Sequence, residues 1–510
     1  MSNILYISSE AYPFIKTGGL GDVAGSLPVE LLKQSQNVRL LLPAYAEVLG
    51  KLDKHKVLTE TTYYNLQVRL IETKLPGSKL TVWLVDCPAA FNRPGGPYAN
   101  EHGQQWHDNA LRFAIFCQLA TDIALNRFAL KWQTEIVHCN DWQSGLVPAL
   151  LSLHPVRPAS IFTIHNLAYQ GVFNRQTFED LHLAESLWNI DGLEYYGNMS
   201  FIKAGIAYAD KITTVSPNYA SEIQHSKFGY GLDGLLSHRS DDLIGILNGI
   251  DNKYWNPNTD SYIKQNYNRR SLNKKLLNKT DLQCELSLEE NASVPMIGMV
   301  SRLVSQKGLE IILQSLPRLL KMPLQIVILG TGETHYEMLL TEWAKEYSNQ
   351  FKVIIGYDES LAHRIEAAAD LYLMPSTFEP CGLNQLYSLR YGTLPVVTNV
   401  GGLADTVIDV NTQPGIEANG FVLNNHTASD LSDTVERAIN LYENKKLWRE
   451  LQINAMSCDF SWKNSAGQYT DVYEQVLKQR APAPEESVST QITPTSISPL
   501  GNDEEKHTRV

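Results

Sequence analysis

Three segments of the chain combine charged side chains with glycines in a way that suits an anionic substrate. The first, residues 16–22, reads Lys-Thr-Gly-Gly-Leu-Gly-Asp. Its glycines would let backbone N–H groups approach a phosphate closely, and Lys16 adds a full positive charge. We therefore predict that Lys16, Gly18 and Gly19 bind a diphosphate or a carboxylate. A flexible turn between a strand and a helix would contain the same glycines.

The second segment, residues 301–308, reads Ser-Arg-Leu-Val-Ser-Gln-Lys-Gly and follows an apolar run. Arg302 and Lys307 lie five residues apart, so both could converge on one anion, the arginine as a planar fork and the lysine as a point charge. This pair predicts a clamp for a leaving diphosphate. Two solvated surface charges are the alternative.

The third segment, residues 375–385, reads Pro-Ser-Thr-Phe-Glu-Pro-Cys-Gly-Leu-Asn-Gln and follows another apolar run. Pro380 restricts Glu379 to an extended conformation. The helix expected next leaves free N–H donors at its start, so the backbone at Cys381, Gly382 and Leu383 is predicted to bind substrate. The segment thus indicates a carboxylate beside an anion site, although a helix-capping acid would look the same.

Smaller polar signals stand at the ends of other apolar runs. Each places a polar group or an aromatic ring where a sugar could be hydrogen-bonded or a base stacked. Taken singly, each is more commonly a turn or a packed core residue. They are Asn140-Asp141-Trp142, His165-Asn166, Asn248-Gly249-Ile250-Asp251 and Tyr357.

Two series of short apolar runs predict the strands that must position these segments. The first covers residues 4–8, 38–42, 81–85, 136–139, 161–164 and 211–215, and the second covers 296–300, 324–329, 352–355, 371–374 and 394–397. Such runs, separated by helical periodicity, are typical of parallel strands buried on both faces. Because open α/β sheets bind ligands beyond the carboxyl ends of their strands, two facing sheets would gather these segments into one site.

Changes in composition suggest the domain boundaries. We predict an N-terminal α/β domain at residues 1–250, a polar connection rich in Asn, Lys and Asp at 251–293, and a C-terminal α/β domain at 294–460. Residues 480–510 contain Pro, Ser, Thr and Glu but almost no large apolar groups. Burial cannot offset the ordering entropy there, so we expect a disordered tail.

Composition also excludes several classes of function. The formal net charge is −12, so no overall positive field would attract nucleic acid. The chain shows neither a signal peptide nor a run of about 18 apolar residues, so we expect no membrane span and a cytoplasmic location. The six cysteines form no C-x-x-C pair, which fits free thiols. No D-x-D motif occurs, so we expect no metal and no other cofactor.

Several longer motifs occur in a fixed order along the chain. They are KTGGLGDVAGSLP, HNLAYQG, DGLEYYGNMSFIKAG, ITTVSPNYA, LNGID, VSRLVSQKG, STFEPCGLNQLYSLRYGTLPVV and GGLADTV. Together they closely resemble the bacterial glycogen and starch synthase family over residues 3–478. The resemblance implies a GT-B fold, in which two Rossmann-like domains face each other, the C-terminal domain holds most of the donor, and a last helix at 461–478 returns to the N-terminal domain.

The resemblance further implies a reaction and a set of site residues. The reaction is retaining transfer of glucose from a nucleotide-sugar donor, ADP-glucose, to the non-reducing 4-hydroxyl of an α-1,4-glucan acceptor, in glycogen biosynthesis. The residues implied for catalysis are Glu379, Lys307, Arg302 and His165, and those implied for substrate binding are Lys16, Gly18, Gly19, Asp141, Asn166, Asn248, Tyr357, Cys381, Gly382 and Leu383.

Three positions depart from the pattern of the family. Thr377 stands where many members carry Arg, and Asn384 where many carry Thr. Tyr387 occupies the second acidic position of the E-x7-E pattern found in other GT-B transferases. Two alternatives stay open: a related transferase of the sucrose-synthase, trehalose-synthase or phosphorylase type, and a non-catalytic glucan-binding homologue. The latter would be expected to lose Glu379, Arg302 or Lys307, and all three are present.

Overall fold

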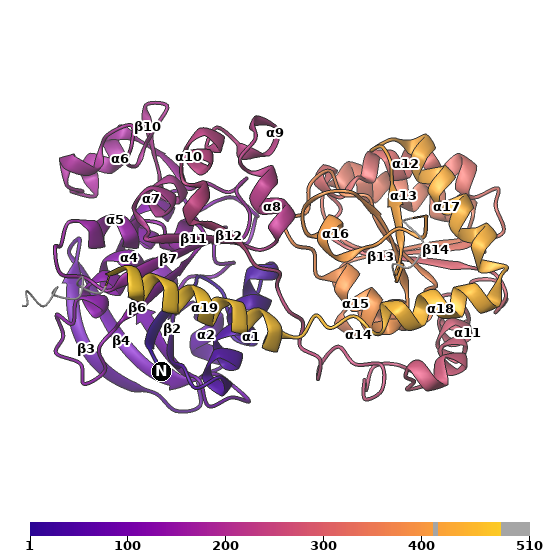
Figure 1. Ribbon diagram of the computed structural model, residues 1–510, viewed down its shortest axis with the longest axis horizontal. Coiled ribbons are helices and arrows are strands. Elements are labelled where there is room, and N and C mark those ends of the chain that lie inside the picture. Colours follow the sequence, from indigo (N-terminus) through magenta and orange to yellow (C-terminus); the bar gives the residue numbers. More distant parts are fainter. Residues whose placement is uncertain (412–416, 481–510) are drawn as a thin grey trace, which may run out of the picture.

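The computed structural model describes residues 1–411 and 417–480, which form two α/β domains (Figure 1). Each domain has a largely parallel sheet packed against helices, which confirms the predicted fold class of two Rossmann-like domains. Apart from Arg480, the tail predicted at 480–510 lies outside the described residues.

The N-terminal sheet has nine strands in the order β12-β11-β7-β6-β1-β2-β5-β4-β3. Its pairs are parallel except at the β5-β4-β3 edge. The side chains of the central strands are buried on both faces and mostly apolar, as in β1, where Ile4, Leu5 and Ile7 are fully buried. The strands are β1 (Asn3–Ile7), β2 (Asn37–Pro43), β3 (Lys56–Tyr63), β4 (Leu66–Lys74), β5 (Thr81–Asp86), β6 (Ile136–Asn140), β7 (Ala159–Ile164), β11 (Lys211–Thr214) and β12 (Leu243–Gly245).

Helices and one small sheet complete the N-terminal domain. The small antiparallel sheet has the order β8-β10-β9, with β8 (Val172–Asn174), β9 (Glu194–Tyr195) and β10 (Asn198–Ser200). The helices are α1 (Gly19–Lys33), α2 (Ala46–Gly50), α3 (Pro88–Phe91), α4 (Asn109–Ala124), α5 (Leu146–Ser152), α6 (Arg175–Asp180), α7 (Phe201–Tyr208), α8 (Pro217–Glu222), α9 (Ser226–Gly229) and α10 (Asp233–His238).

The C-terminal sheet has six parallel strands in the order β15-β14-β13-β16-β17-β18. Its strands are β13 (Met296–Val300), β14 (Gln325–Gly330), β15 (Phe351–Ile355), β16 (Leu371–Met374), β17 (Leu394–Thr398) and β18 (Phe421–Leu423). Its helices are α12 (Leu309–Leu319), α13 (Thr334–Glu346), α14 (Glu359–Ala368), α15 (Asn384–Tyr391), α16 (Gly401–Thr406), α17 (Ala428–Tyr442) and α18 (Lys445–Ala455).

The segment 251–293, expected as a connection, contains a helix that packs onto the C-terminal domain. This helix is α11 (Lys275–Glu285), and it lies against α14. Buried Lys275 donates from Nζ to the Ala367 carbonyl at 2.9 Å and to Thr393 Oγ1 at 2.8 Å. Lysines and asparagines therefore serve as buried residues here, which is why composition alone gave the segment a polar, connecting character.

The last helix crosses back to the N-terminal domain. This helix, α19 (Trp462–Arg480), lies across that domain in Figure 1 although it follows the C-terminal domain in sequence. Buried Tyr473 places its hydroxyl 2.7 Å from His138 Nδ1 on β6. Within the described residues, no helix has the length and apolar character needed to cross a membrane.

Candidate active site

Three adjacent strands of the N-terminal sheet, β7, β6 and β1, end at one edge and lead into predicted site residues. Asp141 follows β6, and its Oδ1 accepts a hydrogen bond from the backbone N–H of His165, which follows β7, at 2.7 Å. The His165 ring is fixed by Asn140, whose Oδ1 lies 2.9 Å from Nε2. Asn140 Nδ2 donates to the Ile7 carbonyl at 2.9 Å, so its oxygen faces the ring and Nε2 carries the proton.

Burial sets the charge of these two residues. It lowers the pKa of His165 to about 3, so the imidazole is neutral near pH 7 and offers Nδ1 as an acceptor. Burial also raises the pKa of Asp141 to about 7, although hydrogen bonds from the backbone of His165 and Asn166 lower it. His165 is therefore suited to orient a hydroxyl and unsuited to stabilise a negative charge.

Asp141→Asn should remove part of the pH dependence of stability. The folded protein holds the Asp141 proton up to about pH 7, whereas the unfolded chain releases it near pH 4. Between these values the folded state binds more protons, so the stabilising contribution of the raised pKa falls as pH rises and is lost above about pH 7. The difference in free energy of unfolding between the asparagine variant and the parent should therefore shift in favour of the variant as pH rises. The shift should be on the order of 2 kcal/mol from about pH 5 to about pH 8.

Denaturant unfolding at these two pH values measures the gain. Asp53→Asn, at an exposed position, is the matched control and should show no such change. A difference between the Asp141 variant and the parent that stays constant with pH would show that Asp141 is ionised throughout.

Glu10, which sequence reasoning missed, holds the glycine turn in place. Its carboxylate is almost fully buried and accepts from the backbone N–H groups of Thr17 at 2.5 Å and Gly18 at 3.2 Å. It also accepts from the hydroxyls of Thr17 and Tyr98, each at 2.5 Å. The Gly18 N–H is thus already used inside the turn. An acidic residue shortly after an apolar run was the only signal in the sequence.

Lys16 stands on the same turn and faces the C-terminal domain. Its Nζ lies 2.9 Å from Asp22 Oδ1. The pKa of Glu359 in the C-terminal domain is lowered mainly by a hydrogen bond to His363 and further by the charge of Lys16. A Cβ on Gly21 would come within 3.1 Å of the Lys16 side chain. The glycine therefore leaves room for Lys16 to extend along the start of α1.

In the C-terminal domain, the structure pairs two of the predicted catalytic residues directly. Lys307 Nζ lies 2.5 Å from Glu379 Oε2, and both side chains are largely buried. Ser376 Oγ donates to the same oxygen at 3.0 Å. Lys307 belongs to the loop after β13 and Glu379 to the loop after β16, and these strands are neighbours. Gly308, with φ 74°, permits the approach, since a Cβ there would lie 2.1 Å from the Pro375 carbonyl oxygen.

The two domains touch through these same loops. The Cβ position of Gly19 lies 3.8 Å from Leu383 Cδ1, so the glycine turn contacts the start of α15. Burial raises the pKa of the Cys381 thiol to about 12, while hydrogen bonds from Asn248, across the domain boundary, lower it. Predicted residues from both domains therefore meet at one interface.

A second group of contacts joins the domains beside the first. The backbone N–H of Gly401, at the start of α16, donates to Glu222 Oε1 at 2.9 Å. In the reverse direction, the N–H of Asn218 donates to Asp405 Oδ2 at 2.9 Å. The hydrogen bonds between α8 and α16 thus align the two sheet edges that carry the site.

Other predicted residues lie at the rim or serve the local fold. Tyr357 is 74% exposed, and its hydroxyl donates to Glu359. Arg302 is exposed and, within the described residues, forms no side-chain hydrogen bond or ion pair. Asn166 Oδ1 accepts from the N–H of Ala168 at 3.0 Å, which closes a turn. Arg302 follows β13 and Tyr357 follows β15, so both lie at the sheet edge that carries Lys307 and Glu379, but no contact among the described residues joins them to that pair.

The residues that depart from the family pattern have structural partners here. Asn384 donates from Nδ2 to the Tyr372 hydroxyl at 2.8 Å. Tyr387, at the second acidic position, stacks on Trp255 with ring centroids 3.9 Å apart. Thr377 is exposed, and its N–H donates to the Gln306 carbonyl at 2.9 Å. An aromatic stack therefore fills the place where a second carboxylate would lie.

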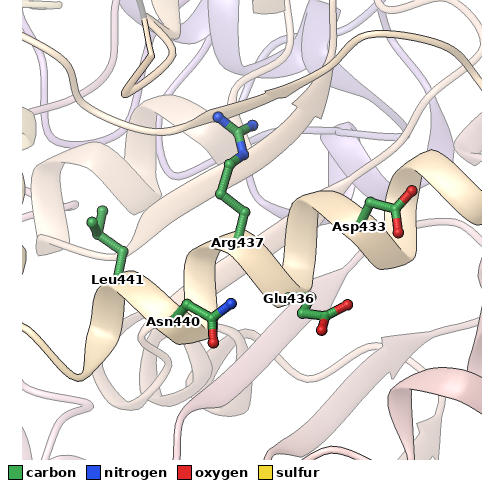
Figure 2. Close-up of a pocket in the computed structure, with 5 residues that line it drawn as sticks. All are labelled: Asp433, Glu436, Arg437, Asn440 and Leu441. Atoms are coloured by element: carbon green, nitrogen blue, oxygen red, sulfur yellow. The ribbon is translucent and has the colours of Figure 1, made fainter.

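Hollows elsewhere on the molecule lie away from these groups. Figure 2 shows one of them on α17, where Asp433 and Glu436 belong to its lining. Its volume is about 420 Å³, and both acidic side chains pair with Arg318. A larger hollow of about 1170 Å³ lies beside α4 and α6 in the N-terminal domain. The predicted site residues, all within the described part of the chain, line neither hollow.

Both domains match known families. Residues 3–238 match the family described as starch synthase catalytic domain, and residues 287–454 match glycosyl transferases group 1. Together with two Rossmann-like domains that meet at their strand-end loops, these matches define the protein as a glycosyltransferase of the GT-B fold. The chain belongs to the glycogen and starch synthase family.

Individual relatives support this assignment over nearly the whole chain. The glycogen synthase of Cellvibrio japonicus is 54% identical over 93% of this chain and 99% of its own length. Glycogen synthase 1 of Methylococcus capsulatus is 47% identical over 93% and 96%. The catalytic domain of starch synthase IV from Arabidopsis thaliana, solved with ADP and acarbose, has a TM-score of 0.85 at 31% identity and covers 94% of this chain and 99% of that one.

Proposed function

We propose that this protein transfers glucose from ADP-glucose to the non-reducing 4-hydroxyl of an α-1,4-glucan, with retention of configuration and release of ADP, in glycogen biosynthesis. The observation that carries the proposal is the Lys307–Glu379 pair at the edge of the donor domain, with the glycine turn of the N-terminal domain in contact with the adjoining loop. The relative solved with ADP and acarbose supports a nucleotide donor and a glucan-like acceptor.

The charges of the site favour transfer on one face of the sugar. A retaining glycosidase would use two carboxylates about 5 to 5.5 Å apart, but Tyr387 fills the second position here. We therefore propose that the bond from C1 of glucose to the diphosphate breaks while the acceptor O4 bonds to C1 on the same face. The proton of that hydroxyl passes to the departing diphosphate, whose charge Arg302 and Lys307 stabilise.

Glu379 and neutral His165 would orient the glucose during this step. A carboxylate accepts hydrogen bonds from sugar hydroxyls, and His165 Nδ1 is an acceptor because Nε2 carries the proton. Asp141 Oδ1 accepts a hydrogen bond from the backbone N–H of His165 at 2.7 Å, so Asp141 acts by positioning His165. Contact between the two domains would exclude water from the reacting atoms.

We also propose that the reaction needs no metal ion. Within residues 1–411 and 417–480, no group of three or more His, Cys, Asp or Glu side chains is placed to hold one. Adding EDTA should therefore leave the rate of ADP release within about twofold of the untreated rate, because lysine, arginine and backbone N–H groups neutralise the diphosphate. A large loss that Mg²⁺ restores would contradict this.

Nucleotide release from ADP-glucose and UDP-glucose, each with glycogen, tests the proposed activity. We expect ADP release to be the faster reaction and the new linkage to be α-1,4 by NMR. Glycogen binding with no nucleotide release from either donor would favour the non-catalytic alternative. Transfer to fructose or glucose phosphate in place of glycogen would favour a related transferase.

A further inference from the structure

A network of side-chain hydrogen bonds joins β13, β16 and α15 at the carboxyl ends of the C-terminal strands. Asn384, the first residue of α15, donates from Nδ2 to the Val300 carbonyl at 2.5 Å and to the Tyr372 hydroxyl at 2.8 Å. The Tyr372 hydroxyl donates to the Val300 carbonyl at 3.1 Å and accepts from the Val300 N–H at 2.9 Å. Tyr372 is fully buried, so its side chain does not reach a bound substrate.

The network fills a gap between two strands. β13 and β16 pair in register as far as Gly298 with Tyr372, and they part beyond that point. The N–H of Ser301 donates to a carbonyl of β14, so the backbone groups of the preceding residue, Val300, point the other way, toward β16. Tyr372 and Asn384 therefore take the place of the ladder and supply the hydrogen bonds that Val300 needs.

The gap lies where the order of the strands reverses. The chain runs from β13 outward to β14 and β15, and then returns to place β16 on the other side of β13. Open α/β sheets bind ligands at such a point, beyond the carboxyl ends of the strands. Both loops that carry the predicted catalytic residues start here, since residues 301–308 follow β13 and residues 375–383 follow β16. In Figure 1, α15 lies on the side of the C-terminal domain that faces the N-terminal domain.

The network ties together the two parts of the site that are expected to hold the diphosphate. Val300 directly precedes the loop that carries Arg302 and Lys307. Asn384 directly follows residues 381–383, whose backbone is predicted to bind substrate. The Asn384 amide thus sets the distance between the side-chain charges and the start of α15. A threonine, which many family members carry here, has a single donor hydrogen and could not make both of these hydrogen bonds.

We infer that Asn384 and Tyr372 are positioning residues for the donor diphosphate, which hold Arg302 and Lys307 at a fixed spacing from the first turn of α15. Groups that are fixed before the donor arrives need no reorganisation in the transition state, so they stabilise the departing diphosphate more strongly. The inference rests on the proposed function, since it concerns the same donor.

Asn384→Ala should lower kcat for glucosyl transfer about tenfold, less than removal of a charge would, because the charges remain and lose only their fixed spacing. Its KM for glycogen should stay within about twofold of the parent. Binding of ADP, followed by calorimetry, and of adenosine, followed by NMR titration, locates the effect in the full chain. ADP carries the charge of the departing diphosphate, so its Kd should rise about tenfold, whereas that of adenosine should stay within about twofold.

Tyr372→Phe separates positioning from direct contact. The buried hydroxyl does not reach the donor, so the phenylalanine variant should bind ADP as the parent does if Asn384 acts only by touching the diphosphate. If the network positions both parts of the site, Tyr372→Phe should raise the Kd for ADP as Asn384→Ala does. The double variant should then be little worse than either single one. Equal affinity for ADP in Tyr372→Phe and the parent would overturn the inference.

Two matched controls account for lost stability. Tyr267→Phe removes another buried hydroxyl, which donates to the carbonyl of Tyr391 at the other end of α15 at 2.7 Å. Asn454→Ala removes an amide that donates to the Ala418 carbonyl at 3.0 Å. Both controls should lower the melting temperature as the test variants do, yet leave kcat and the two dissociation constants unchanged. Controls that lose as much affinity for ADP would reduce the network to a role in folding and overturn the inference.

ADP binding needs no glucosyl transfer, so it separates this inference from the proposed activity. A parent that binds ADP but releases none from ADP-glucose would overturn the proposed activity alone, and the variants would still report on the network. A parent that transfers glucose while Asn384→Ala binds ADP equally well would overturn the inference alone. A parent without affinity for ADP would overturn both.

Discussion

Lys307→Ala should lower kcat for glucosyl transfer on the order of 10²-fold or more. Lys307 Nζ, 2.5 Å from Glu379, is a positive charge held in place before the donor arrives, on the loop next to the one that would bind the glucose. A preorganised charge of this kind stabilises the charge that develops on the diphosphate in the transition state, and losing one such donor typically costs 10²- to 10³-fold. The KM for ADP-glucose should rise far less than kcat falls.

Steady-state ADP release with saturating glycogen measures this effect. Lys321→Ala, which removes an exposed lysine just after α12, is the matched control and should leave kcat unchanged. Because the alanine variant leaves Glu379 without its partner, melting temperatures should accompany the kinetics. Turnover equal to the parent in a folded Lys307→Ala protein would rule out the proposed role of this lysine.

Glu379→Gln should also lower kcat on the order of 10²-fold, although the side chain keeps its size. The change removes the negative charge of the carboxylate, whose Oε2 accepts a hydrogen bond from Ser376 Oγ at 3.0 Å and lies 2.5 Å from Lys307 Nζ. Without it, Lys307 loses its positioning partner, and the glucose hydroxyls lose a charged acceptor. Both losses act on the same step, so the effect on kcat should resemble that of Lys307→Ala.

The double variant Lys307→Ala/Glu379→Gln separates a joint role from two independent ones. Groups that act as a unit show non-additive losses, so its kcat should fall little below that of either single variant. Glu342→Gln, at an exposed position on α13, serves as the control for loss of a carboxylate. Losses that multiply in full would show that Glu379 acts independently of Lys307.

The two sheets were predictable from the sequence to a large extent. Strands such as β1 and β13 are buried on both faces, so they are nearly continuous apolar runs in the sequence. The hairpin of β3 and β4 was not identified, because its burial alternates and half of its side chains face solvent. Helix α11 was read as a connection because its buried positions include Lys275 and Lys279, each held by backbone carbonyls.

The candidate site was predictable in its parts and not in its contacts. Lys16, Arg302, Lys307 and Glu379 were recognisable because charges and glycines follow apolar runs, where parallel sheets bind ligands. The strand order that puts β13 beside β16, and so Lys307 beside Glu379, depends on pairings between distant segments. Glu10 was missed for the same reason, since its partner Tyr98 is 88 residues away.

The sequence by itself determined the class of this protein: two α/β domains of a glucan synthase, with the charged and glycine-rich loops placed at strand ends. Local rules suffice for this, because the apolar periodicity and the motifs are read within short windows. Only the tertiary structure decided which side chains are paired and which are neutral. Burial makes His165 neutral and strand order joins Lys307 to Glu379, because these properties arise from neighbours that are distant in the chain.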